Sequence, residues 1–483
     1  MQNTLEKKID WFLKKNAYEI VLIFLLVLYI VYFTLASIAR YNNFYTGRFD
    51  LGNMDQTVWN TSQGRIFQLT NPNGTDIISR LAFHADFFLI LLSPFYLLWP
   101  DPKILLLLQT VVIGCGAVFV FLLAKDILKN KKIGLLFALL FLINPSVEHM
   151  NLYDFHAVTF ATTFLLATFY FLQKRRYALF VFFALLSAST KEQIWIIVVL
   201  LGLYTIFITK KKILGLLMTI FSLFLFYYLV WHAIPTARGA KHFALSYYSD
   251  FGESPTAIIK NIIVFPQKTL TTILQFDRLH YILQLFLPVG FLSFFSPLTL
   301  IFLFPDLFIN LLSNNAQLRE IYFQYTAAIT PFVFISGIFG LKTLTKIFAK
   351  IPLFYYEALL VIAAVVSAYL YGPLPGARNP NLDMFTKPQK DKTIITYYLA
   401  HIPKSQSVAA TNNLGSHLSH REKIFTIPVG IDKADVIAFL LDDPFAQPSP
   451  QAQRKMVESL KKNSQYSVLF DNDEFILFQK IPN

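Results

Sequence analysis

Charged residues and cysteine are scarce in this sequence. Only 15% of its 483 residues are charged, whereas 55% are apolar and 50 are Phe. Soluble globular proteins carry about 25% charged residues. The composition therefore excludes a disordered chain, a coiled coil and an ordinary soluble enzyme. The single cysteine, Cys115, excludes an intramolecular disulfide and a Cys-based zinc or iron–sulfur site. Because it lies in an apolar run, we expect it to serve packing.

Several nucleotide-binding and hydrolase motifs are also absent. The sequence has no Walker A loop, no dinucleotide Gly fingerprint, no H-E-x-x-H and no G-x-S-x-G. Nothing in it therefore indicates that ATP or a nicotinamide cofactor is used. The net charge of +13 could suggest nucleic acid as a partner. However, the basic residues form short clusters between apolar runs, which predicts membrane orientation and no nucleic-acid partner.

Long apolar runs predict an α-helical polytopic membrane protein with about eleven transmembrane helices. The expected spans are 18–38, 103–124, 133–147, 157–173, 177–190, 193–209, 213–232, 280–294, 297–312, 326–341 and 353–371. Several are shorter than the roughly 20 residues that a perpendicular helix needs to cross a bilayer, so these must bend or be shielded by neighbouring helices. We expect the first run to be retained as a span and not cleaved as a signal peptide, because it is long for that role.

Five basic clusters give the expected orientation. They are Lys7, Lys8, Lys14 and Lys15; Lys125, Lys129, Lys131 and Lys132; Lys174, Arg175 and Arg176; Lys210, Lys211 and Lys212; and Lys342, Lys346 and Lys350. With eleven spans all five fall on one side, which the positive-inside rule makes the cytoplasm. The predicted location is the cytoplasmic (inner) membrane, with the N-terminus in the cytoplasm and the C-terminus outside.

The chain divides into three predicted regions. Residues 1–371 form the transmembrane domain, 372–384 a Pro- and Gly-rich linker, and 385–483 a small soluble α/β domain on the extracytoplasmic side. The expected outer loops of the first region are 39–102, 144–156, 233–280 and 313–325. In the third region we expect strands at 407–411, 423–428, 436–441, 467–470 and 475–479, and helices at 390–401 and 449–463.

Two acids in the first outer loop are candidate site residues. Asp50 directly follows the first span and either caps a helix ending near Gly64 or acts as a general base at the mouth of a membrane cavity. Asp55 is five residues further on, so a helix would turn it away from Asp50. We therefore count Asp55 among the residues lining a site and not as Asp50's catalytic partner.

A second group of candidates combines acids and histidines. His84 lies before an apolar piece expected at the membrane interface, and Glu148, Asp154 and His156 share one short outer loop. Asp154 either caps a helix or is a second catalytic carboxylate, while the others either are solvated or line the site. His84, Asp154 and His156 could also ligate a divalent cation, although their spacing matches no fixed metal motif.

Lys191 and Glu192 interrupt a long apolar stretch. The stretch predicts a helical hairpin with these residues at its outer tip, below the membrane surface. The alternative is a solvated Lys–Glu pair, but ionisable groups at membrane depth usually face a cavity. Lys191 is thus a candidate ligand of a lipid phosphate. Arg319 is a second candidate, and Arg238, Lys241 and His242 are similar but weaker ones.

Several segments, taken in order, resemble a family of bacterial and archaeal polytopic membrane proteins of unknown function. They are Phe49-Asp50-Leu51-Gly52, Asp55-Gln56, Trp59-Asn60, His84, Asp154-Phe155-His156, Lys191-Glu192, Asn310-Leu311-Leu312-Ser313, Tyr325, Pro331-Phe332, 409–413 and 418–421. That family is similar in architecture to the GT-C superfamily of membrane glycosyltransferases, which includes protein O-mannosyltransferases and the lipid A aminoarabinose transferase. The resemblance implies a polyprenyl-phosphate sugar donor. It also implies an acidic residue that acts as the catalytic base in the first outer loop, where Asp50 lies. The Asp-Glu pair common in that loop is missing, since Leu51 follows Asp50.

The favoured hypothesis is a transferase that moves a sugar from a polyprenyl-phosphate donor to an unidentified acceptor at the outer membrane face. The alternatives are a lipid or solute transporter or flippase, and a non-catalytic membrane-anchored binding protein. In the last case the outer domain would do the work, although Asn412, Asn413, His417, His420 and Arg421 form no catalytic constellation. The expected partners are the lipid-linked donor and membrane lipid, with a divalent cation as an optional cofactor.

Overall fold

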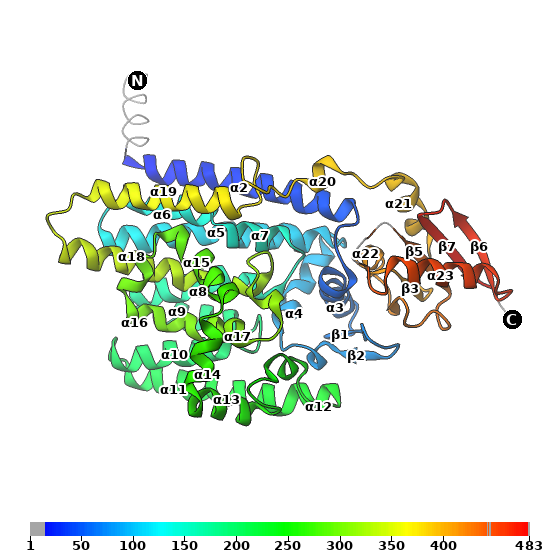
Figure 1. Cartoon of the computed structure of the whole chain (residues 1–483), viewed down its shortest axis with the longest axis horizontal. Coiled ribbons are helices and arrows are strands. Elements are labelled where there is room, and N and C mark those ends of the chain that lie inside the picture. Colours follow the sequence, from blue (N-terminus) through cyan, green and yellow to red (C-terminus); the bar gives the residue numbers. More distant parts are fainter. Residues whose placement is uncertain (1–14, 442, 444–445, 482–483) are drawn as a thin grey trace, which may run out of the picture.

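In the computed structural model, which describes residues 15–441, 443 and 446–481, apolar helices lie side by side and a small sheet stands at one end (Figure 1). Lys7, Lys8 and Lys14 of the first basic cluster lie outside these ranges. The helices of the apolar part are α2 (Ala17–Asn42), α3 (Asn53–Ser62), α4 (Phe88–Leu92), α5 (Lys103–Leu128), α6 (Lys131–Leu142), α7 (Pro145–Leu152), α8 (Phe160–Gln173), α9 (Tyr177–Ala188), α10 (Ile194–Phe207), α11 (Lys212–Tyr228), α12 (Ile234–Arg238), α13 (Pro255–Val264), α14 (Pro266–Ile273), α15 (Phe276–Phe286), α16 (Pro297–Leu300), α17 (Phe304–Leu312), α18 (Thr330–Ile347) and α19 (Leu353–Tyr371).

Four of these stretches are long and apolar enough to cross a membrane: α2, α5, the continuous stretch Lys212–Arg238 that includes α11 and α12, and α19. The pair α6 and α7 would make a fifth span that bends by 44°. Pro145, which has no amide hydrogen to donate, begins α7 at this bend. The remaining apolar segments are shorter helices, so the chain is a multi-pass membrane protein while the count of eleven spans stays a prediction.

The predicted span 280–294 is wrong as a single helix. α15 ends at Phe286, and the chain then makes short 3-10 turns around Pro288 and Gly290. Gly290 has a φ of +58°, in the left-handed region that glycine adopts without strain. The predicted hairpin at 177–209 is confirmed, because α9 and α10 flank the polar tip Ser189–Gln193.

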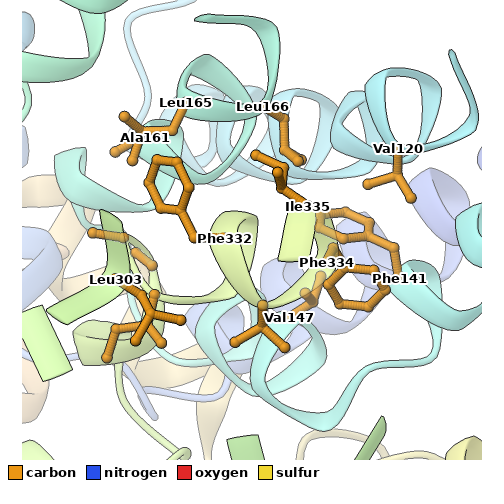
Figure 2. Packing of buried hydrophobic residues seen from close by; sticks show 14 of the residues in the cluster. Val120, Phe141, Val147, Ala161, Leu165, Leu166, Leu303, Phe332, Phe334 and Ile335 are labelled. Atoms are coloured by element: carbon orange, nitrogen blue, oxygen red, sulfur yellow. The ribbon is translucent and has the colours of Figure 1, made fainter. Parts of the chain in front are cut away.

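A continuous apolar core joins the helices. Figure 2 shows Phe332 and Ile335 of α18 packed among Ala161, Leu165 and Leu166 of α8. Phe141 of α6 contacts Phe334 edge to face, with ring centroids 5.3 Å apart. Since α18 is surrounded by earlier helices, it forms a buried centre that fixes the spacing of the outer segments. Cys115 is a half-buried free thiol of α5.

The C-terminal part contains a five-stranded mixed sheet with strand order β4-β3-β5-β7-β6. Its elements are α20 (Asp383–Thr386), α21 (Lys392–His401), β3 (Val408–Ala410), α22 (Asn412–Gly415), β4 (Ile424–Thr426), β5 (Val436–Leu440), α23 (Pro450–Lys461), β6 (Tyr466–Asp471) and β7 (Phe475–Lys480). β3 pairs in parallel with β4 and β5, whereas β7 is antiparallel to β5 and β6. α21 and α23 contribute to different apolar clusters of the sheet, so they cover opposite faces.

The segment that follows α2 lies between the helices and this sheet (Figure 1). It contains α3 and a hairpin of β1 (Gln68–Thr70) and β2 (Ile77–Ser79). Gln56 of α3 donates to the carbonyls of Arg421 and Glu422, at 2.9 and 3.1 Å. Both the apolar helices and the C-terminal unit therefore fix this segment, which carries Asp50.

Candidate functional site

A cavity of about 520 Å³ is enclosed by segments that are far apart in the sequence. Its polar lining includes Asp50, His84, His156, Lys191 and Glu192. One wall is apolar and comes from the stretch Lys212–Arg238, from α13 and from α17: Phe226, Val230, Trp231, Ile258, Ile259, Ile262 and Phe308. Ionisable groups thus meet a surface suited to hydrocarbon in a single chamber.

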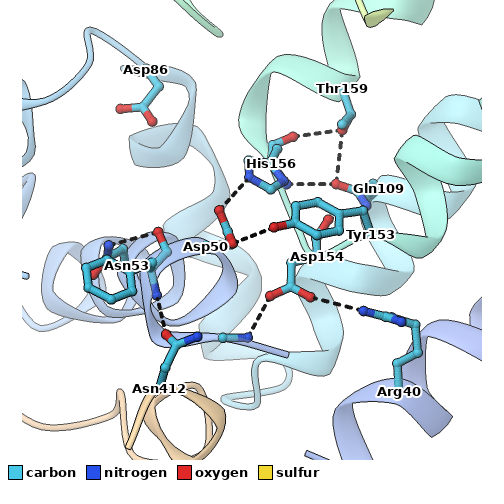
Figure 3. A network of polar contacts seen from close by, with 12 residues as sticks. Arg40, Asp50, Asn53, Asp86, Gln109, Tyr153, Asp154, His156, Thr159 and Asn412 are labelled. Atoms are coloured by element: carbon cyan, nitrogen blue, oxygen red, sulfur yellow. Dashed lines mark hydrogen bonds and ion pairs between the residues drawn. The ribbon is translucent and has the colours of Figure 1, made fainter. Parts of the chain in front are cut away.

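Asp50 lies in a π-helical turn, Arg48–Gly52, that leads directly into α3. It forms no capping hydrogen bond, so the expectation that it only caps a helix is wrong. Its Oδ1 is 3.1 Å from Nε2 of His156, and its Oδ2 accepts a hydrogen bond from the Tyr153 hydroxyl at 3.0 Å (Figure 3). The carboxylate therefore faces the cavity with two fixed partners.

The surroundings of Asp50 favour its ionised form. Burial alone would raise the pKa of this carboxyl, but the hydrogen bond and charge of His156, the Tyr153 hydroxyl and the positive charge of Arg80 together lower the pKa below its ordinary value. Asp50 is consequently an anion at neutral pH, which a general base requires.

The loop 153–156 is held by Gln109 of α5. Gln109 accepts a hydrogen bond from the His156 amide at 2.9 Å and donates to the Asp154 carbonyl at 3.2 Å. The ring of Tyr153 stacks on that of His156, with centroids 5.5 Å apart. Tyr153 escaped the sequence reasoning, although its place next to the Asp154–His156 motif was a usable signal.

Asp154 lies behind this loop and outside the cavity lining. One carboxylate oxygen accepts from the Gly47 amide at 2.7 Å, and the other is 3.8 Å from the Arg40 guanidinium (Figure 3). Burial and the negative charge of Asp50 raise the pKa of Asp154 to about 7. Asp154 thus contacts the backbone that precedes Asp50 and not the space where a substrate would lie.

Glu192 at the hairpin tip has its carboxylate oxygens occupied by protein groups. His84 Nδ1 lies 2.9 Å away, the Ala85 amide donates at 3.1 Å, and His242 Nε2 is at 3.6 Å. Although burial would raise it, the pKa of Glu192 is held well below its usual value by the charge of His84 and by hydrogen bonds from both histidines. This cluster fixes the hairpin tip beside Asp50's cavity.

Lys191 differs from its neighbours because no carboxylate is paired with it. Its ammonium nitrogen lies 5.8 Å from the centroid of the Tyr325 ring, and within the described ranges it has no ion pair. Arg80, another cation of the lining, makes a two-pronged pair with Asp86 at 2.7 and 3.1 Å. The charge of Lys191 interacts at longer range with the carboxylates of Glu192 and Asp306, but no described carboxylate forms a salt bridge with it, so its ammonium can also meet an anion that enters the cavity.

Like Asp154, three further predicted site residues lie outside this cavity. Asp55 is fully buried against Tyr96, Ser419 and His420 and does not line the cavity, because α3 turns it toward the C-terminal unit. Glu148 is buried in α7, also outside the lining, and its carboxylate oxygens have no hydrogen-bond partner in the described structure.

Arg319 is the third of these residues. Its guanidinium is 2.8 Å from Asp277 and lines a second cavity of about 540 Å³. This second cavity also includes Asp277, His149 and His280 and contains none of the groups around Asp50. Arg319 is therefore separated from the site that we expected it to serve.

The predicted metal ligands do not converge. His84 is paired with Glu192, His156 with Asp50, and Asp154 with the Gly47 amide. No group of three or more His, Cys, Asp or Glu side chains among the residues that the structure describes could hold a metal ion. Each proposed ligand makes a separate protein contact, so the three side chains do not gather into one site in the described structure.

Residues 40–477 match the family described as "Predicted membrane protein (DUF2079)". The chain belongs to that family. Comparison with curated proteins finds none that matches. Among solved structures, the chain is similar to the crystal structure of ArnT from Cupriavidus metallidurans bound to undecaprenyl phosphate.

The likeness to ArnT spans 96% of this chain and 98% of ArnT, with a TM-score of 0.51 and 10% sequence identity. Identity this low supports a shared fold and nothing finer. It confirms the GT-C-like architecture that the sequence resemblance implied. The chemistry of this chain has to be argued from its own residues.

Proposed function

We propose that this protein is a glycosyltransferase that moves a sugar from a polyprenyl-phosphate donor to an acceptor hydroxyl. The observation that carries the proposal is the cavity itself, where an anionic Asp50 and a Lys191 that forms no salt bridge with any described carboxylate lie beside an apolar wall. A carboxylate base and a separate cation are what displacement of a phosphate by a hydroxyl needs.

In the proposed reaction Asp50 takes the proton of the acceptor hydroxyl. The acceptor oxygen forms a bond to the anomeric carbon while the bond from that carbon to the phosphate oxygen breaks. The phosphate leaves with the bonding electron pair, and Lys191 stabilises its charge. His156 and Tyr153 keep the Asp50 carboxylate oriented.

The apolar wall supports a lipid-linked donor. Its Phe, Trp and Ile side chains offer hydrocarbon contact beside the charged groups, as an isoprenoid phosphate requires. ArnT, whose fold this chain shares, was crystallised with undecaprenyl phosphate. Together these observations favour a polyprenyl phosphate over a soluble nucleotide sugar.

We further propose roles and an orientation for the other predicted parts. Asp154 supports the turn of Asp50 and does not itself take a proton, while His84 and Glu192 fix the hairpin tip that presents Lys191. The eleven-span topology, the inner-membrane location and the outer placement of residues 385–483 follow from the basic clusters and belong to this proposal.

Native mass spectrometry of the purified protein with undecaprenyl phosphate tests the donor site. Lys191→Ala should weaken binding at least tenfold, since a charge-assisted contact to phosphate is lost. Lys211→Ala is the matched control, because Lys211 also lies over a tyrosine ring, 5.5 Å from the centroid of Tyr177, but outside the cavity. Equal binding by both variants would remove Lys191 from the phosphate site.

A second assay separates transfer from transport. The purified protein is incubated with a panel of undecaprenyl-phosphate sugars, and release of undecaprenyl phosphate is measured with membrane-fraction acceptors or water. Release that requires Asp50 supports the transferase. Movement of the intact donor across liposomes without release would favour the flippase alternative.

A further inference from the structure

The turn that carries Asp50 is packed between two distant parts of the chain. On one side the Gly47 amide donates to Asp154 at 2.7 Å. On the other side the turn meets α22 of the C-terminal unit and the residue after it, Ser416. The geometry of the candidate base therefore depends on residues more than 350 positions away in the sequence.

Two polar contacts connect the turn to the C-terminal unit. The Phe49 amide, directly before Asp50, donates to Oδ1 of Asn412 at 3.2 Å (Figure 3). The Thr46 and Ser416 hydroxyls lie 2.8 Å apart, with both side chains buried. Both contacts involve residues that closely precede Asp50, so they constrain the direction in which its side chain leaves the backbone.

Glycines let the two backbones approach closely here. A Cβ atom on Gly415 would lie 2.2 Å from Cβ of Arg48, and one on Gly52 would lie 3.2 Å from backbone atoms of Ser416. Arg48 is fully buried and donates to Gln56 at 2.7 Å. The backbone of the turn is thus tightly packed against α22 and Ser416 on both sides of Asp50, with the Phe49–Asn412 hydrogen bond at the exposed edge of this contact.

Asn412 itself closely follows β3, an interior strand of the C-terminal sheet. It begins α22 two residues after β3, and β3 pairs with β4 on one side and β5 on the other. All three residues of β3 are buried. A side chain at the end of such a strand has a well-defined position, which suits it to hold another segment in place.

We propose that Asn412 is a positioning residue of the C-terminal unit, which fixes the backbone of the turn that carries Asp50. Ser416 makes the second contact between the C-terminal unit and this turn, at Thr46. The C-terminal unit then contributes directly to the geometry of the site. The catalytic consequence rests on the proposed function of Asp50, whereas the structural claim does not.

Hydrogen–deuterium exchange of the full-length protein in nanodiscs tests the structural claim without any substrate. Asn412→Ala removes the acceptor of the Phe49 amide, so exchange of the peptide spanning residues 46–52 should become about tenfold faster. Asn412→Asp keeps an oxygen acceptor and should restore slow exchange. Asn463→Ala is the matched control, because Asn463 also accepts a backbone amide, that of Gln465 at 3.0 Å, but far from the turn.

The outcomes decide the proposal in either direction. The proposal is supported if the peptide exchanges faster in Asn412→Ala, and if exchange is slow again in Asn412→Asp and unchanged in Asn463→Ala. Exchange equal to that of the unchanged protein overturns it. If Asn412→Ala does not fold, Ser416→Ala takes its place, with faster exchange of the same peptide expected and unchanged exchange overturning the claim.

Transfer kinetics then test the consequence for the site. Asn412→Ala should lower kcat about tenfold with little change in KM for the donor, since the donor contacts are untouched. The acid limb of the pH profile of kcat/KM should also move to higher pH in this variant. A displaced Asp50 loses its contacts with His156 and Tyr153, which lower its pKa. If Asp50→Asn retains activity, the proposed function fails while the exchange result still decides the positioning claim.

Discussion

Asp50 and Asp55 lie five residues apart, each next to a histidine, yet their surroundings differ. The Asp50 side chain is 30% exposed and faces a cavity, with His156 at 3.1 Å. The Asp55 side chain is 0% exposed and meets His420 at 3.1 Å, together with the hydroxyls of Tyr96 and Ser419. One carboxylate keeps an open side toward solvent, whereas protein groups surround the other. Access, and not residue type or a histidine partner, therefore distinguishes a candidate base from a structural carboxylate.

The largest effect on activity is expected from Asp50→Asn. Removing a general base should lower transfer by about 100-fold to 10,000-fold. The fold should persist, because the amide keeps the shape of the carboxylate and can still contact Tyr153 and His156. Release of undecaprenyl phosphate measures the first effect and a thermal melt the second. Asp76→Asn, in the exposed outer hairpin, is the control. Near-normal transfer by Asp50→Asn would contradict the assignment of Asp50 as the general base.

Asp55→Ala probes the other half of the comparison. It leaves buried hydroxyl and imidazole groups without their shared acceptor, so we expect a loss of about 3 kcal/mol in stability. The C-terminal unit should detach from α3 more readily, since both Ser419 and His420 lie there. Thermal melts and limited proteolysis in nanodiscs measure these effects. Asp55→Ala protein with normal stability but no activity would instead place Asp55 in the chemistry.

His156→Asn sharpens the description of Asp50. His156 lowers the pKa of Asp50, and the base works only when ionised, that is, above that pKa. Activity of the unchanged protein should therefore persist as the pH falls below the ordinary range of a carboxyl group. Without the imidazole the pKa of Asp50 rises, so the acid limb of kcat/KM should move to higher pH. An unmoved acid limb would mean that Asp50 is not the group titrating in the rate.

The sequence predicts part of this arrangement through its position relative to apolar runs. Asp50, His156 and Lys191 each follow or interrupt such a run, and all three line one cavity. Helix geometry was enough to separate Asp55 from Asp50, but it did not show that Asp55 and Glu148 both face other parts of the protein instead of lining the site. The contact between Asn412 and the turn of Asp50 was also out of reach, because it joins residues that no local periodicity relates.

Helix boundaries were predicted correctly where polar or Pro residues interrupt an apolar run, as at the polar tip between α9 and α10. The expected strands all overlap the observed ones: 436–441, for example, corresponds to β5. The failures lie where tertiary packing interrupts an apolar run, as after α15 at Pro288 and Gly290. Apolar composition alone does not reveal whether such a run continues as one helix or breaks into turns.

The smallest effect is expected from Arg319→Ala, and it compares two cations that look alike in the sequence. Lys191 lines the cavity of Asp50 and forms no salt bridge with a carboxylate in the part of the chain that the structure describes, whereas Arg319 is paired with Asp277, whose side chain is 51% exposed. Exposed ion pairs contribute about 0–1 kcal/mol, and Arg319 faces the second cavity. Undecaprenyl phosphate affinity should therefore change by no more than about twofold, measured beside Lys191→Ala in the same binding assay. A tenfold loss in Arg319→Ala would mean that the donor reaches the second cavity as well as the cavity of Asp50.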